Sequence, residues 1–207
     1  KVSCMIWLGG MNMKFKTSHS FVLASASPRR KELFSVLNLP FEVITANVDE
    51  KSFSFVNEMQ YVRDVALLKT RAIANQTTNK VVIGADTIVA FEGRLLHKPQ
   101  TKEEAVAHLQ ALSGQTHYVY TAVVIIDSEK NETIIIEKTA VTFKVLSTAL
   151  IEAYVDTNDC YDKAGGYGIQ TMGMLLVDKI EGDYNNVVGL PISSLTEHLL
   201  TLNYISI

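Results

Sequence analysis

The sequence predicts an α/β protein, because short β-branched runs alternate with amphipathic helical segments from residue 20 onward. No internal repeat, low-complexity tract or long linker interrupts this alternation. The 207 residues fit one domain, which can have two lobes, since a single core stops growing near ~250 residues. We therefore expect a single domain over residues 21–207. Residues 1–20 hold an apolar stretch too short for a signal peptide, and we expect a leader, an expression remnant or a disordered tail there.

The first half of the domain contains three expected strands and two expected helices. Residues 21–24 are apolar and predict a buried strand, and the dipeptide Ser27-Pro28 then supplies an N-cap residue and a proline suited to the first helical position. Residues 41–45 predict a second strand, and the apolar stripe of residues 58–75 predicts the second helix. Residues 81–90 are apolar on both sides of one acid, which indicates a central strand buried on both faces.

The second half adds a helix, a long hairpin and four closing elements. Thr101 and Glu104 have the spacing of a capping box, so a helix should begin there and end at Gly114. Two β-rich runs joined by a turn-like segment then predict an antiparallel hairpin. The later expected elements are the hairpin strands 117–126 and 133–146, a helix at 150–157, a glycine-rich loop at 163–170, a strand at 175–180 and a helix opening at Pro191.

Composition and charge exclude several classes of function. With 19 Lys and Arg against 22 Asp and Glu, the chain has a net charge of −3 and lacks the positive field of a protein that binds nucleic-acid polymers. No run of about 18 apolar residues occurs, so we expect no membrane span. The two cysteines, Cys4 and Cys160, are far apart and match neither a disulfide framework nor a thiolate zinc site. These features favour a reducing, cytoplasmic setting.

Residues 25–31 form the first candidate site. Two serine hydroxyls and the cations Arg29, Arg30 and Lys31 gather where the first strand turns into a helix. Cations in a first helical turn are unfavourable without an anion, whereas the free N–H groups of a helix N-terminus and arginine side chains together suit a phosphate. The alternative interpretation is a capped surface helix with solvated basic side chains.

Asp86, followed by Thr87, is the second candidate. A carboxylate inside an apolar strand is costly unless it is paired, holds a metal or acts as a base. We favour a functional acid, and the alternative is a structural aspartate that accepts backbone hydrogen bonds at a strand end.

Weaker candidates could complete such a site. Each charged residue of this group is, taken alone, more often exposed to solvent than functional. The histidines lack metal-ligand spacing, and the glycine run 165–168 is not a dinucleotide fingerprint. Neither a P-loop nor a nucleophile-elbow motif occurs. The weaker candidates are Asp49, Glu50, Lys69 and Lys98.

Five segments of the sequence are together more specific than any one of them. They are residues 23–33, 82–87, 98–99, 112–117 and 162–170. In this order they closely resemble the motifs of the Maf family of nucleotide pyrophosphatases, and the resemblance runs from about Phe21 to Leu200. It implies a two-lobed α/β fold around an elongated, twisted mixed β-sheet flanked by helices, with the active site in a cleft between the lobes. It also implies a homodimer.

The resemblance further implies hydrolysis of a nucleoside triphosphate between its α and β phosphates, with a divalent cation (Mg, Mn or Co) as cofactor. In the family pattern, Asp86 is the proton acceptor, and Glu50 and Asp86 are the metal ligands, of which Glu50 is the surer one. The residues that would contact the phosphates are Ser25, Arg29, Arg30, Lys69 and Lys98.

Three positions place the chain near the branch of this family that acts on dTTP and UTP. They are Arg29, Thr87 and Gln170, which the resemblance implies to be substrate-binding residues, and the branch that prefers 7-methyl-GTP has an aromatic residue, Gln and Glu there. A Gln amide can both donate to and accept from a neutral pyrimidine edge, whereas a carboxylate attracts the cationic methylated guanine. Two alternatives remain, a related enzyme for modified nucleotides and a non-catalytic nucleotide-binding regulator of septum formation.

Overall fold

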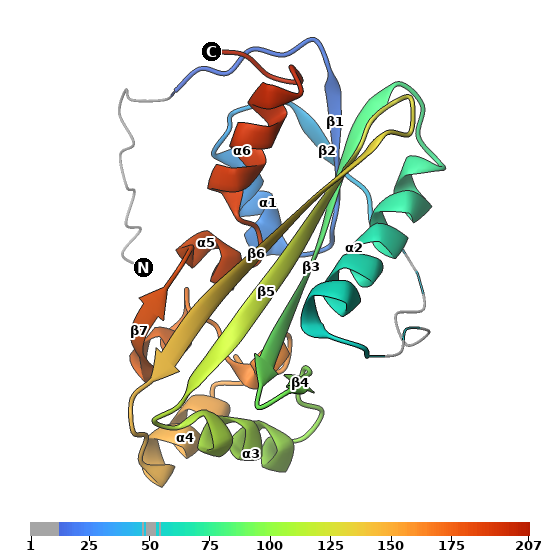
Figure 1. The fold of residues 1–207 in the computed structure, drawn as a ribbon. Coiled ribbons are helices and arrows are strands. Elements are labelled where there is room, and N and C mark those ends of the chain that lie inside the picture. Colours follow the sequence, from blue (N-terminus) through green and yellow to red (C-terminus); the bar gives the residue numbers. More distant parts are fainter. Residues whose placement is uncertain (1–12, 47, 49–52, 54) are drawn as a thin grey trace.

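The computed structural model describes residues 13–46, 48, 53 and 55–207. In this part of the chain seven strands form one mixed sheet, in the order β2-β1-β3-β5-β6-β7 with β4 paired to β3 (Figure 1). β1 runs parallel to β2 and β3, and all other pairs are antiparallel. The strands are β1 (Ser20–Ala24), β2 (Phe41–Val43), β3 (Lys80–Phe91), β4 (Arg94–Leu96), β5 (Thr116–Ile126), β6 (Glu132–Phe143) and β7 (Val177–Glu181). The predicted mixed α/β fold is therefore confirmed.

Helices begin where the sequence places their caps. The Ser27 side chain accepts from the Arg30 N–H with Pro28 in the first position, and Thr101 caps the third helix through the Glu104 N–H. Within the described residues none of the helices has the length and apolar character needed to cross a bilayer. The helices are α1 (Pro28–Ser35), α2 (Glu58–Ala74), α3 (Lys102–Leu112), α4 (Thr148–Val155), α5 (Tyr184–Val188) and α6 (Ile192–Thr201), with 3-10 turns at Ala164–Gly166 and Met172–Leu176.

Several element boundaries differ from the prediction. β2 ends at Val43 instead of Thr45: its register with β1 ends at the pair of Leu23 and Val43, although the Ile44 N–H still donates to the Leu23 carbonyl. The strand expected at 175–180 begins at Val177, since the residues before it form a 3-10 turn. The sequence analysis missed β4 and α5, which have three and five residues and are too short for a periodic signal.

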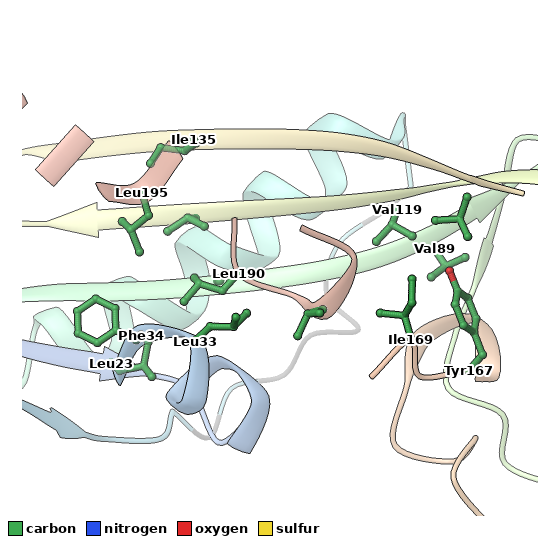
Figure 2. Close-up of a cluster of buried hydrophobic side chains, with 14 of the residues drawn as sticks. Leu23, Leu33, Phe34, Val89, Val119, Ile135, Tyr167, Ile169, Leu190 and Leu195 are labelled. Carbon is green, nitrogen blue, oxygen red and sulfur yellow. The ribbon is translucent and has the colours of Figure 1, made fainter. Parts of the chain in front are cut away.

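The alternation of side chains along β3 divides the core into two parts. The odd-numbered residues face a cluster that includes α1, α3, α4, α5 and α6, whereas Val82, Ile88 and Ala90 face α2. Figure 2 shows the first cluster, from Leu23 and Phe34 at one end to Tyr167 at the other. The central strand is thus buried on both faces, as predicted.

The middle of β3 has an open edge. β1 pairs with β3 only as far as Gly84, and β4 pairs only from Val89 onward. Among the described residues no strand therefore covers β3 between these points on this side. Residues 25–27 connect the end of β1 to the start of α1, so the first residues of α1 lie at this opening.

On the face of β3 that carries Val82, Ile88 and Ala90, α2 lies unusually close to the strand. A Cβ atom at Gly84 would stand 2.1 Å from Thr70 Oγ1, so only glycine permits this approach. Because Lys69 precedes Thr70 on α2 and Asp86 follows Gly84 by two residues, the close approach brings their side chains together.

Candidate active site

A cavity of about 420 Å³ lies at the open edge of β3. It is lined by the end of β1, the start of α1, part of α2, the middle of β3 and the loop after α4. Of the sequence-predicted site residues that the structure describes, Lys31 is exposed on α1 and does not line the cavity. The others line it: Ser25, Arg29, Arg30, Lys69, Asp86, Thr87, Lys98 and Gln170. The remaining one, Glu50, lies outside the described residues, as does Asp49.

The lining carries an excess of positive charge. Five cationic side chains face two carboxylates among the described lining residues, although the whole chain is negative. Such a local excess attracts an anion even when the net charge of the protein does not. The cations are Arg29, Arg30, Lys69, Lys98 and Lys163, and the carboxylates are Asp86 and Asp162.

Asp86 points from β3 toward α2 and forms an ion pair with Lys69. The Lys69 Nζ atom donates to Asp86 Oδ1 at 2.7 Å, and the two side chains are only 20% and 13% exposed. Asp86 lies in the middle of the strand and not at its end. The Lys69 cation therefore compensates the charge of Asp86. This arrangement differs from the alternative interpretation, in which a structural aspartate accepts backbone hydrogen bonds at a strand end.

Arg29 and Lys98 occupy more open parts of the cavity. Arg29 Nη1 donates to Asp162 Oδ2 at 2.9 Å, and Lys98 is exposed. Ser25 is buried, and its hydroxyl oxygen accepts from the Ser27 N–H at 3.2 Å. The mouth of the cavity thus has long cationic side chains, with a fixed hydroxyl deeper inside.

Arg30 and Thr87 lie on the face of β3 opposite to Asp86. The Arg30 guanidinium donates to the carbonyls of Gly189 and Ala85, at 2.7 and 2.8 Å. It also donates to Thr87 Oγ1 at 2.9 Å. The guanidinium that the sequence assigns to phosphate therefore donates to protein atoms of β3 and of the end of α5.

An ion network around the buried Lys163, which the sequence analysis missed, supports the loop that carries Gln170. Lys163 is 8% exposed and its Nζ atom donates to Asp159 Oδ1 and Asp162 Oδ1, at 2.9 and 2.6 Å. Tyr154 donates to Asp159 Oδ2, and its hydroxyl oxygen accepts from the Gly168 N–H. Burial alone would raise the pKa of Asp159, but hydrogen bonds from Thr171, Lys163 and Tyr154 hold it below its ordinary value. The sequence feature that could have indicated this network is the adjacent pair Asp162 and Lys163 at the start of the glycine run.

His117 is a core residue that stiffens the same loop. Its ring is fully buried, its Nε2 atom lies 2.8 Å from the Tyr167 hydroxyl, and burial lowers its pKa to about 4. With this pKa the ring is neutral at physiological pH.

The fold and the site define an α/β protein with a cationic cavity of the kind that receives phosphate groups, at the open edge of its sheet. The chain belongs to the Maf family, because the family model described as "Maf-like protein" matches residues 20–202.

Curated relatives cover nearly all of the chain. A dTTP/UTP pyrophosphatase of Bacillus anthracis (strain CDC 684 / NRRL 3495) is 47% identical over 182 residues, which are 88% of this chain and 95% of the relative. A dTTP/UTP pyrophosphatase of Bacillus cereus (strain ATCC 10987 / NRS 248) is 45% identical and covers 94% of this chain and 93% of the relative. Among solved structures, a HAM1 protein from Coxiella burnetii has a TM-score of 0.52 at 15% identity, covering 88% of this chain and 99% of that one. That likeness concerns the fold alone.

Proposed function

We propose that this chain hydrolyses dTTP and UTP to the nucleoside monophosphate and pyrophosphate. The observation that carries the proposal is that one cavity combines the partly buried Asp86 carboxylate with several cationic side chains. A triphosphate has close to four negative charges, and its cleavage depends mainly on positioning and on neutralisation of charge. The relatives named dTTP/UTP pyrophosphatase, at up to 47% identity, support the choice of nucleotide.

In the proposed mechanism Asp86 accepts a proton from the attacking water. The water oxygen forms a bond to the α-phosphorus, the bond from this phosphorus to the α–β bridging oxygen breaks, and pyrophosphate leaves. Lys69 lies 2.7 Å from the carboxylate and orients it, and its positive charge suits a phosphate oxygen in the same cavity. Arg29, Lys98 and the Ser25 hydroxyl would contact the phosphates, since all three line the same cavity.

The cavity also suits a divalent cation. Mg²⁺ is commonly held by one or two carboxylates together with substrate phosphates. Asp86 offers one such carboxylate, and the part of the chain that the structure describes has no cluster of three or more His, Cys, Asp or Glu side chains that could form a complete protein cage. A bound Mg²⁺, Mn²⁺ or Co²⁺ would neutralise charge on the phosphates. We propose Asp86 as one ligand and Glu50 as the other.

Gln170 is the proposed contact to the nucleobase. It is half-buried, it lines the cavity, and the network around Asp159 and Lys163 fixes the loop before it. Its amide can donate to and accept from the uracil or thymine edge, and modified pyrimidines that keep this edge should also be substrates.

A product assay tests the proposal. UTP is incubated with the protein and Mg²⁺, with and without EDTA, and the products are identified by mass spectrometry. UMP and pyrophosphate are expected without EDTA, and neither is expected with it. Release of orthophosphate would reject the assigned bond. Binding of UTP without any turnover, equal in the wild type and Asp86→Asn, would instead support a nucleotide-binding regulator.

The proposal extends to the form of the protein in the cell. We infer a cytoplasmic homodimer whose single domain spans residues 21–207 and has two lobes, one on each side of the cavity. The family resemblance supports these points, and sedimentation at several concentrations tests the dimer.

A further inference from the structure

The hydroxyl of Thr87 has its only hydrogen directed into the protein. β3 and β5 pair so that Thr87 stands opposite Thr121, and the two hydroxyl oxygens are 2.9 Å apart. Thr121 donates its own hydrogen to the Asn186 carbonyl at 3.0 Å. Because a hydroxyl has one hydrogen, Thr87 must be the donor to Thr121.

The direction of the whole chain of hydrogen bonds follows from this. Arg30 Nη2 donates to Thr87, Thr87 donates to Thr121, and Thr121 donates to the carbonyl of Asn186 in α5. Thr87 therefore has no hydrogen left for a nucleobase. It lines the cavity, but its remaining capacity is one acceptor lone pair.

The Arg30 guanidinium, which is the first donor in this series of hydrogen bonds, connects α1, β3 and the end of α5. Arg30 lies on α1 and donates to the Ala85 carbonyl on the open edge of β3, immediately before Asp86. It also donates to the carbonyl of Gly189, the residue that ends α5. Gly189 has φ 119°, and a Cβ atom there would lie 3.3 Å from Thr87 Oγ1, so the backbone packs directly on this junction.

We propose that Thr87 and Thr121 are positioning residues, whose hydrogen-bonded chain holds the Arg30 guanidinium against the Ala85 carbonyl and thereby fixes the segment of β3 that carries Asp86. Residues that contact the base would affect nucleotide binding. The two threonines instead act on the rate of the reaction. The kinetic part of this inference rests on the proposed function.

Thr139 on β6 provides a matched control. It is buried, its hydroxyl donates to the Asp183 carbonyl at 3.0 Å, and it accepts from Asn186 Nδ2 at 2.9 Å. It thus anchors α5 as Thr121 does, and none of its hydrogen bonds involves Thr87 or Arg30. Thr139→Val should cost similar stability without disturbing the guanidinium.

Steady-state kinetics with UTP compare Thr87→Val, Thr121→Val, Thr121→Ser and Thr139→Val. Thr87→Val and Thr121→Val should each lower kcat by about two- to tenfold, the effect of one lost hydrogen bond, with KM changed less than about twofold. Thr121→Ser keeps the hydroxyl and should restore kcat, and Thr139→Val should match the wild type. A raised KM in Thr87→Val with unchanged kcat in Thr121→Val would overturn the inference and assign Thr87 to the base.

A second readout needs no activity. The side-chain Nε–H of Arg30 is bonded to the Gly189 carbonyl and should give an NMR signal that exchanges slowly with water, assigned by its loss in Arg30→Lys. Exchange should be at least about tenfold faster in Thr87→Val and Thr121→Val than in the wild type or Thr139→Val. Equal exchange rates in all four proteins would overturn the inference, whereas a wild type that exchanges as expected but leaves UTP intact would remove only the proposed function.

Discussion

Lys69 on α2 and Asp86 on β3 form an ion pair of 2.7 Å inside the cavity, with both side chains mostly removed from solvent. Removal of the Lys69 amine leaves the partly buried Asp86 carboxylate without this cation. The loss of folding stability then exceeds what the ion pair itself contributes. The pair therefore serves both the stability of the α2–β3 contact and the proposed chemistry.

Lys69→Met should destabilise the protein by about 1–3 kcal/mol, measured by urea unfolding at pH 7, because Asp86 loses its partner. The double variant Lys69→Met with Asp86→Asn should recover part of this loss, since no uncompensated charge remains. Arg71→Met is the control on the same helix, because the exposed pair of Arg71 and Glu132 should contribute less than about 1 kcal/mol. Additive effects in the double variant would contradict the coupling.

Asp86→Asn should lower kcat for UTP by about 10²- to 10⁴-fold, because an amide cannot accept the proton from water. The variant keeps the size of the side chain but loses the ion pair with Lys69, so the thermal midpoint should fall, as it should in Lys69→Met. Asp178→Asn, an exposed change on β7, controls for net charge. Wild-type turnover in Asp86→Asn would remove the carboxylate from the mechanism.

Much of the fold could be predicted because its signals are local. Ser27 with Pro28 and Thr101 with Glu104 fix helix starts by bonding within one turn, and the apolar run around Asp86 can only be a buried central strand. Most of the described site residues lie in segments that resemble a family, whereas Lys69 lies outside those segments. Their roles stay predictions.

The rest depends on contacts between distant residues, for which one sequence has no signal. Thr87 meets Thr121 only through the register of β3 against β5, 34 positions away in the chain. Arg30 was assigned to phosphate because charge at a helix start suits an anion, and its bonds to backbone carbonyls follow only from how α1 packs on the open edge. In the network around Lys163, Tyr154 of α4 likewise meets the loop at the Gly168 N–H, 14 positions away in the chain.

Gly84→Ala should separate α2 from β3. The new Cβ would lie 2.1 Å from Thr70 Oγ1, so the helix must move outward at a cost of about 1–3 kcal/mol, and the ion pair behind it must lengthen. Both urea stability and turnover of UTP should fall. Combining the change with Thr70→Ala removes the clashing oxygen and should recover part of both losses. Full activity in Gly84→Ala would show that the close approach does not position Lys69.

The buried ring of His117 makes stability depend on pH. Burial lowers its pKa to about 4, whereas an unfolded histidine titrates near 6.5, so between these values the unfolded chain binds the extra proton. The contribution of His117 is thus fully present above pH ~6.5 and is lost as the pH falls toward 4. At pH 5 the loss relative to pH 7.5 should be about 2 kcal/mol, read from urea unfolding.

His117→Gln isolates this effect, because the amide does not titrate and can still bond to the Tyr167 hydroxyl, which lies 2.8 Å from the His117 ring nitrogen. The variant should be less stable than the wild type at pH 7.5, since it loses the edge contacts of the ring with Phe143 and Tyr167. Its stability should nevertheless fall less between pH 7.5 and pH 5, and the two curves should converge. Parallel curves over that interval would mean that His117 takes up its proton in the folded state. The inference that the buried ring stays neutral would then be wrong.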